Sequence, residues 1–434
     1  MTTTAISDPF SEAALSRVEE QLAGTDSLLA NAYPGDTADR QPVHTVYVAA
    51  HLLTADTVAE WGRAALAAVD GVGGLERLAG HLGEELGLDA DADLDPAVLA
   101  RLVEAKLASE PIEDLRVDFE DGLGAVSDAE EDAAVASSLA AIAAMRERGA
   151  LPPHVGLRFK CFENDTRARG IRTLGLFIAG LAEQEGGLPE GLEITLPKVT
   201  TVEQVEAMVY LCEQLEERLG LPAGRLRFEV QVETPQVVID AEGRVPLARL
   251  IHAGGGRVSS LHYGTYDYSA SLGVAGGYQS MEHPVADFAK SFIQVAAAGT
   301  GVRYSDGSTN IVPAGDGLQR LDAWALHARL VRRSLERAIY QGWDLHAHQL
   351  PTRYLASFAF FRTGLSSTIT RLDNYLGGKD SAVMDEPATA RALAAFLVRG
   401  VNCGAVPEQE LSERIDVSPD AIRALAYPNR STKE

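Results

Sequence analysis

The sequence predicts a parallel (β/α)8 barrel, because eight short apolar segments recur along the chain and helical patterns lie in most of the gaps. Most of the segments end in a polar or turn-forming sequence such as E-D-G, E-T-P or G-T-Y-D. The chain has 434 residues, of which 46% are hydrophobic, and this is ample for a large core. The alternation of strand and helix favours a closed barrel over an open sheet.

Taken in order, the strand candidates begin near residue 43 and end near residue 346. They are Val43–Ala49, Leu115–Phe119, Val155–Cys161, Leu192–Leu196, Arg227–Val232, Val258–Tyr263, Thr309–Val312 and Trp343–His346. The helical patterns are Ser11–Asn31, Asp56–Val69, Ala129–Arg148, Gly170–Gln184, Thr201–Leu219, Val285–Ala298 and Leu318–Gln341, with a largely helical tail from Ala388 to Ala426.

These patterns divide the chain into three parts. We expect an N-terminal helical and loop segment at 1–42, a barrel domain at 43–351 and a helical C-terminal extension at 352–434. An insertion at about 70–111 interrupts the alternation and contains the acidic run Asp89–Asp95. The run lacks the Gly and the terminal Glu of an EF-hand, so we interpret it as a solvated surface.

The charge of the chain excludes several classes of partner. Its 38 basic and 62 acidic residues give a net charge of −24, which repels nucleic acid and anionic membranes. No apolar run is long enough to span a membrane, and the N-terminus lacks a signal-peptide pattern. The three cysteines are far apart and form no CxxC pair. We therefore expect a cytoplasmic protein without a disulfide framework or a structural zinc site.

Two carboxylates mark the ends of consecutive strand candidates. Glu233 ends V-Q-V-E-T-P, and Asp267 follows H-Y-G-T-Y 34 positions later. That spacing suits successive β-α-β units, whose strand ends meet at the carboxyl side of a sheet. Two carboxylates with open coordination are suitable ligands for Mg²⁺ or Mn²⁺. The alternative is a salt-bridged strand end at Glu233 and a helix N-cap at Asp267.

Charged residues also end the second and third strand candidates. Arg158 lies in the otherwise apolar G-L-R-F-K-C-F, where it either binds a carboxylate or forms a structural ion pair with Glu120. Lys160 lies on the same strand face as Arg158. The sequence V-D-F-E-D-G places Asp118, Glu120 and Asp121 at one strand end. Such crowded acids either supply a general base or serve as caps and ion-pair partners.

Several histidines and one cysteine are weaker candidates. His51 follows the first strand candidate, and His346 and His348 end the eighth. The two last histidines form either a metal pair or hydrogen-bonded residues of the barrel mouth. Cys161 ends a strand, but no Cys-His arrangement supports a thiol nucleophile.

Taken together, the strand-end motifs resemble the HpcH/HpaI aldolase and citrate lyase β-subunit superfamily, the pyruvate- and phosphoenolpyruvate-binding barrels. In order along the chain, D-L-E-D-A is matched by Asp118-Phe119-Glu120-Asp121-Gly122, R-V-N by Arg158-Phe159-Lys160, L-P-K by Leu196-Pro197-Lys198, I-E-T by Val232-Glu233-Thr234, G-x-x-D-x-x-x-x-L-G in outline by Gly264 to Gly273, and I-H-P-x-Q by Leu345-His346-Ala347-His348-Gln349. Lys160 replaces an Asn and Ala347 a Pro, and the strand-two histidine of class II aldolases is absent.

The resemblance implies roles for the strand-end residues. It implies that Glu233 and Asp267 bind Mg²⁺ or Mn²⁺, and that Arg158 holds the carboxylate or oxo group of a 2-oxo acid. It also implies that the acid pair Glu120 and Asp121 lies near the substrate. We expect Asp121, or a water that it holds, to move the proton, with His51 as the alternative. Further substrate contacts are expected from Lys160, Gly264, Thr265 and Tyr266.

The leading functional hypothesis is therefore a divalent-metal-dependent carbon–carbon lyase of the aldolase type, acting on a 2-oxo or hydroxy acid through an enolate. The first alternative is an acyl-CoA-dependent enzyme of the citryl-CoA lyase or malate synthase type. The second is a non-catalytic barrel that binds an oxo acid. The resemblance also implies a homo-oligomer, a trimer or a hexamer.

Overall fold

The computed structural model describes residues 10–88, 94–315, 317–377 and 386–428. Eight strands form its central sheet, in the spatial order β7-β6-β5-β4-β3-β2-β1-β8. Their bounds are β1 His44–Ala49, β2 Asp114–Asp118, β3 His154–Arg158, β4 Leu192–Leu196, β5 Phe228–Val232, β6 Val258–Tyr263, β7 Arg303–Ser305 and β8 Gly342–Asp344. All neighbouring pairs are parallel, as helical crossovers require.

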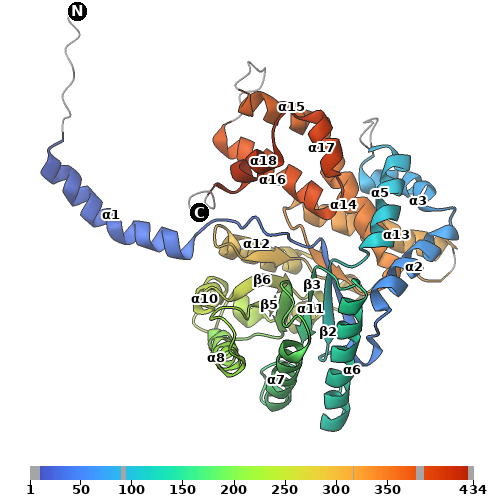
Figure 1. The fold of residues 1–434 in the computed structure, drawn as a ribbon, viewed down its shortest axis with the longest axis horizontal. Helices are drawn as coiled ribbons and strands as arrows, with labels where there is room; N and C mark the ends of the chain where they lie inside the picture. The colour runs from blue at the N-terminus through green and yellow to red at the C-terminus, as the bar shows by residue number, and fades with distance from the viewer. Residues whose placement is uncertain (1–9, 89–93, 316, 378–385, 429–434) are drawn as a thin grey trace, which may run out of the picture.

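Helices connect the strands and surround them (Figure 1). The helices associated with the barrel are α2 Thr57–Asp70, α6 Asp128–Glu147, α7 Arg167–Glu183, α8 Val202–Leu219, α9 Pro235–Val238, α10 Pro246–Ala253, α11 Thr265–Ser271, α12 Pro284–Ala297, α13 Gly317–Glu336 and α14 Leu350–Arg362. Short 3₁₀ turns are η1 Ala50–Leu52, η3 Gly276–Tyr278 and η4 Ala347–Gln349. The predicted (β/α)8 barrel is thereby confirmed.

The barrel closes between its last two strands through backbone hydrogen bonds. The N–H of Asp306, directly after β7, donates to the carbonyl of Gln341 at 2.9 Å. The N–H of Trp343 in β8 donates to the carbonyl of Gly307 at 3.1 Å. These two bonds connect the two end strands of the sheet, so the barrel is nearly closed.

The strands alternate between an apolar outer face and a polar inner face. Leu115, Ile194 and Val230 are fully buried members of the hydrophobic core. The inner residues reach across the barrel, since Arg116 of β2 donates to Glu229 of β5 at 2.8 Å. The hydrophobic core therefore lies between barrel and helices, whereas the barrel interior is held by hydrogen bonds and ion pairs.

The expected seventh strand at Thr309–Val312 is wrong. The structure forms β7 at Arg303–Ser305, and residues 309–312 belong to the loop before α13. The true strand is only three residues long and begins with Arg, so it carries little apolar signal. The apolar pair Ile311-Val312 instead belongs to a loop that is anchored by Gln349, whose side-chain amide donates to the Thr309 carbonyl at 3.1 Å. The eighth strand also ends at Asp344, so His346 lies beyond it.

The insertion and the C-terminal part are helical. The insertion contains α3 Leu75–His81, α4 Gly83–Leu86 and α5 Pro96–Ser109, while 89–93 of its acidic run lie outside the described residues. The C-terminal lobe contains α15 Leu365–Leu376, α16 Pro387–Cys403, α17 Glu408–Arg414 and α18 Pro419–Ala426 (Figure 1). Helix α14 is almost wholly buried and follows β8 directly. We therefore propose that the barrel unit extends through α14 rather than ending at residue 351.

Helix α1, Glu12–Ala32, projects from the body of the molecule and buries none of its residues (Figure 1). The chain returns to the barrel at Tyr33, whose ring lies 5.8 Å from that of His252. Across the described ranges, no helix combines the length and hydropathy needed to cross a membrane.

Candidate active site

The acidic sequence at the end of β2 folds around the guanidinium of Arg158. Arg158 is the last residue of β3, and its Nε and Nη2 donate to the two carboxylate oxygens of Asp118 at 2.8 and 2.5 Å. The N–H groups of Glu120 and Gly122 also donate to Asp118. A Cβ at position 122 would lie 2.5 Å from an Asp118 oxygen, so this turn requires glycine. Asp118 thus orients Arg158 through a bidentate pair.

The third nitrogen of Arg158 points to the acid pair. Nη1 lies 3.4 Å from Glu120 Oε2 and 3.5 Å from Asp121 Oδ2. The ring of Tyr47, on β1, lies 4.7 Å from the Arg158 Cζ and covers the guanidinium. Since Asp118 occupies Nε and Nη2, Nη1 is the donor that an anionic substrate can use.

Lys198 joins the same group from the end of β4. Its ammonium lies 2.6 Å from Glu120 Oε1 and 3.0 Å from Asp121 Oδ1. Its backbone N–H donates to Glu233 Oε1 at 2.8 Å. Lys198 lies in the L-P-K motif but has no role among the residues predicted from sequence, and the motif itself is the signal that could have found it.

The two acids of the pair have opposite pKa shifts. Burial, reinforced by the Asp121 carboxylate and opposed by Arg158, raises the pKa of Glu120 to about 7. Burial by itself would raise the pKa of Asp121 as well. Its hydrogen bond with Glu120 and the charges of Arg158 and Lys198 outweigh burial, so the pKa of Asp121 is lowered. One carboxyl of the pair therefore carries a proton near neutral pH while the other is ionised. This is a suitable arrangement for proton transfer.

Glu233 follows β5 and is buried without a cation in its immediate contacts. Its exposed fraction is 2%, and none of the described ion pairs includes it. Burial raises its pKa to about 8, and the nearby Asp267 and Glu120 add to the shift while Arg158 opposes it. A Cβ at Gly264, the N-cap of α11, would lie 2.4 Å from Glu233 Oε2. Glycine at 264 therefore makes the space in which this carboxylate lies.

Asp267 lies in the first turn of α11 and is exposed. Its charge acts on the buried Glu233, so the tertiary structure brings the two predicted ligands into electrostatic contact. No cluster of three or more His, Cys, Asp or Glu in a metal-binding arrangement occurs within the described ranges. Two carboxylates, one of them buried and lacking a positive partner, fit a hard divalent cation whose remaining ligands are water or substrate.

Two other predicted residues are not brought into this group. The ammonium of Lys160 contacts the carbonyls of Phe119 and Gly124 at 2.6 and 3.0 Å and lies 3.2 Å from Glu131 Oε2. Lys160 thus donates two hydrogen bonds to the loop after β2 and forms an ion pair with Glu131 of α6. His51 is exposed in η1, and no contact described for the Arg158 group includes it. Their predicted roles remain predictions.

The β6, β7 and β8 side of the mouth consists of linked loops. The hydroxyls of Thr265 and Tyr266 accept the N–H groups of Ser308 and Asn310 from the loop after β7. The Nδ1 of His346 accepts the His348 N–H at 3.1 Å. The Nδ1 of His348 lies 2.9 Å from the Pro313 carbonyl, to which it donates. These histidines are thus hydrogen-bonded residues of the loop ends.

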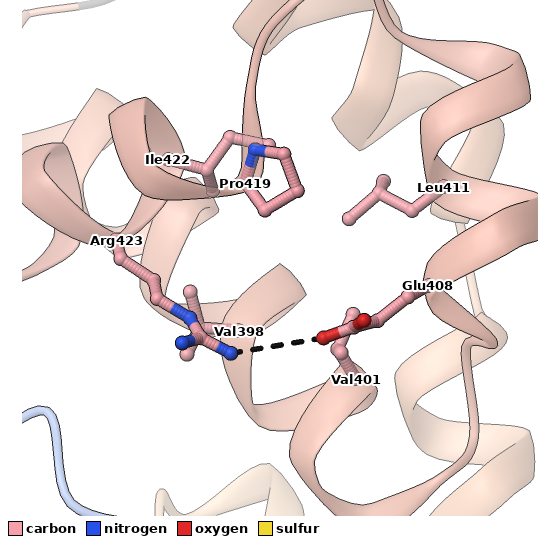
Figure 2. A pocket seen from close by; sticks show the side chains of 7 residues that line it. All are labelled: Val398, Val401, Glu408, Leu411, Pro419, Ile422 and Arg423. Atoms are coloured by element: carbon pink, nitrogen blue, oxygen red, sulfur yellow. Dashed lines mark ion pairs between the residues drawn. The ribbon is translucent and has the colours of Figure 1, made fainter.

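A pocket far from the barrel mouth lies within the C-terminal lobe (Figure 2). It is lined mainly by apolar side chains of α16, α17 and α18, and the ion pair between Arg423 and Glu408, at 3.8 Å, crosses one side. Its volume is about 20 Å³, close to that of one water molecule.

Comparison with known proteins identifies one family. The model of the family described as a domain of unknown function, DUF6986, matches residues 22–430. No curated protein matches the chain.

Solved structures share the fold at low sequence identity. A citrate lyase from Burkholderia xenovorans LB400 is 19% identical with a TM-score of 0.53, covering 75% of this chain and 94% of that chain. Haloferax volcanii malate synthase is 14% identical with a TM-score of 0.49, covering 91% and 99%. CitE from Mycobacterium tuberculosis, solved with magnesium, acetoacetate and coenzyme A, is 16% identical with a TM-score of 0.45, covering 85% and 100%. The chain therefore belongs to the DUF6986 family and has the barrel fold of the citrate lyase structures.

Proposed function

We propose that this protein is a divalent-metal-dependent carbon–carbon lyase that cleaves a 2-oxo or hydroxy acid. The observation that carries the proposal is the charge imbalance at the barrel mouth. Two cations, Arg158 and Lys198, lie there among five carboxylates, Asp118, Glu120, Asp121, Glu233 and Asp267. An enzyme that binds a divalent cation together with a small acid needs such a surplus of carboxylates beside a buried Arg.

Glu233 and Asp267 would hold the Mg²⁺ or Mn²⁺ ion. As a Lewis acid, this ion supplies stabilisation of the negative charge that develops on a carbonyl oxygen. The N–H of Lys198 fixes one oxygen of Glu233, and the absence of a side chain at Gly264 leaves space beside the other.

The remaining residues bind the substrate and move its proton. Arg158 binds the carboxylate or oxo group through Nη1, because Asp118 holds its other donors. Asp121 takes the hydroxyl proton as the carbon–carbon bond breaks, and the electrons of that bond pass into the enolate. Glu120, whose pKa is about 7, returns a proton to the enolate carbon.

The test is a survey of hydroxy and 2-oxo acids, with release of pyruvate or glyoxylate measured in the presence of Mg²⁺ or Mn²⁺. We expect EDTA to abolish turnover and either ion to restore it. A Glu233→Gln, Asp267→Asn double variant should lose at least about 100-fold in kcat/KM, and Arg158→Lys about the same.

A matched control is Glu242→Gln, because Glu242 is an exposed carboxylate paired with Arg244 between α9 and α10. This variant should keep the wild-type rate. Turnover that survives both EDTA and the double substitution would exclude the metal assignment.

Acetyl-CoA should be included in the survey, because the Mycobacterium tuberculosis neighbour was solved with coenzyme A. If turnover requires the thioester, the protein is a condensing or citryl-CoA-type enzyme on the same metal site. The proposal includes a homo-oligomer, a trimer or a hexamer, which light scattering measures directly.

A further inference from the structure

Lys198 contacts both the acid pair Glu120 and Asp121 and the buried Glu233 at the barrel mouth. Its ammonium lies within 3.0 Å of both acids of the Glu120 and Asp121 pair, which comes from β2. Its backbone N–H lies 2.8 Å from Glu233, which follows β5. One residue after β4 thus connects the proton-moving acids to the carboxylate proposed to bind the cation.

The backbone of Lys198 adopts a left-handed conformation, which permits both contacts. Its φ is +51°, and within the described ranges the only other non-glycine residue with positive φ is Ala338. The left-handed conformation costs free energy for a residue with a Cβ, and it is retained where surrounding contacts demand it. At position 198 these contacts are the backbone N–H to Glu233, after β5, and the ammonium to Asp121, after β2. The two partners lie on opposite sides of β4.

We propose that Lys198 is a positioning residue, which holds Glu120 and Asp121 in the geometry for proton transfer without itself reacting. Its ammonium places a positive charge and N–H donors between the two acids, and these contacts fix how the acids lie relative to each other. The inference rests on the proposed lyase function and adds to it a residue with no predicted role.

Lys198→Gly is the informative substitution, because it separates the two connections. Glycine keeps the N–H that binds Glu233 and adopts φ +51° without strain, but it removes the ammonium. We expect kcat to fall about 100-fold, as for loss of proton-transfer catalysis. The KM for the acid and the Mn²⁺ affinity, measured by calorimetry without substrate, should each stay within about 3-fold. The melting temperature should be equal to or above that of the wild type.

Added methylammonium tests whether the lost ammonium acts at this position. It should restore at least about 10-fold of the kcat of Lys198→Gly, since a small cation with N–H donors fits the vacated space. Tetramethylammonium at the same concentration has the charge but no donors, and it should restore nothing. Lys198→Arg, with donors retained on the side chain, should keep more activity than Lys198→Gly.

Three outcomes would overturn the proposal. They are an unchanged kcat in Lys198→Gly, a loss that both ammonium ions restore equally, and a loss of Mn²⁺ affinity as large as the loss of kcat. If Lys198→Gly does not fold, the same comparison is made with Lys198→Arg, and wild-type kcat in that variant together with unfolding of the glycine variant would assign Lys198 a structural role. Absence of metal-dependent turnover in the wild type would instead refute the proposed function, so the two failures are distinguishable.

Discussion

Two buried glutamates of one short segment, Glu229 and Glu233, have opposite pKa shifts. Glu229 lies in β5 and Glu233 lies four residues later, just after the strand, and both are buried. Glu229 accepts from Arg116 at 2.8 Å and from Thr195 at 2.5 Å. Although burial opposes ionisation, Arg116 and His262 hold the pKa of Glu229 below its ordinary value, whereas the pKa of Glu233 rises to about 8.

The comparison separates the barrel interior from the barrel mouth. In the interior, the chain supplies its own cation for each buried carboxylate, as Arg116 does for Asp114 and Glu229 and Arg303 does for Glu193. At the mouth, no ion pair to buried Glu233 occurs in the part of the chain that the structure describes. Buried charge that is matched within the chain maintains structure, whereas a buried carboxyl with a raised pKa is a candidate for a functional role.

The largest expected effect is the opposite response of the two glutamates to the same substitution. Glu229→Gln should lower the free energy of unfolding by about 3 kcal/mol, because Arg116 loses a buried partner. Glu233→Gln, measured at pH 8 in EDTA, should raise it by about 1 kcal/mol, because an unpaired buried charge disappears. Urea denaturation of the two variants and the wild type measures both changes.

Glu242→Gln serves again as the reference for a Glu to Gln change at the surface. If Glu229→Gln and Glu233→Gln destabilise the protein equally, the distinction between a matched interior and an unmatched mouth is wrong.

A smaller effect is the pH dependence that Glu233 contributes. Its pKa is about 8 in the folded protein and about 4.5 when unperturbed, so the folded state holds the proton more tightly. The stability due to the protonated form is complete below pH 4.5 and is lost as the pH rises through 8. In EDTA, the stability of Glu233→Gln relative to the wild type should therefore grow between pH 5 and pH 8.

Thermal unfolding of both proteins across this pH range measures the growth. Mg²⁺ at millimolar concentration should reduce it, since the ion binds the ionised carboxylate. A stability difference that stays constant from pH 5 to pH 8 would contradict a raised pKa at Glu233.

The smallest effect is expected at the surface, where ion pairs lie in water. Arg148 pairs with Asp56 at 2.8 Å, and their side chains are 55% and 61% exposed. Arg148→Ala should change the free energy of unfolding by no more than about 0.5 kcal/mol. If the free energy of unfolding falls by more than about 1 kcal/mol, burial does not explain why the interior ion pairs contribute more to stability than the surface pairs.

Seven of the eight strands could be predicted from local pattern, because each lies in a short apolar-rich stretch of the sequence. The exception, Arg303–Ser305, begins with Arg and carries little apolar signal, and its place in the sheet depends on pairing with β6. The nearby apolar residues Ile311 and Val312 were mistaken for it, since periodicity does not reveal which segment pairs.

For the site, the strand-end acids, Arg158 and the pairing of Glu233 with Asp267 followed from motifs and their spacing. Sequence by itself determined these because parallel strands bring their carboxyl ends to one side of a barrel. Sequence did not assign Lys198 a role or show that Lys160 donates to carbonyls of the loop after β2. These facts depend on a particular φ angle and on particular carbonyl positions.

The tertiary structure alone decided the difference between Glu229 and Glu233. Both are glutamates after an apolar residue in one short segment, F-E-V-Q-V-E, and nothing local distinguishes them. The distinction comes from what other strands place opposite them: Arg116 and His262 opposite the first, and two further carboxylates near the second. A pKa is set by burial and by neighbouring charges, and those neighbours are fixed only when the barrel closes.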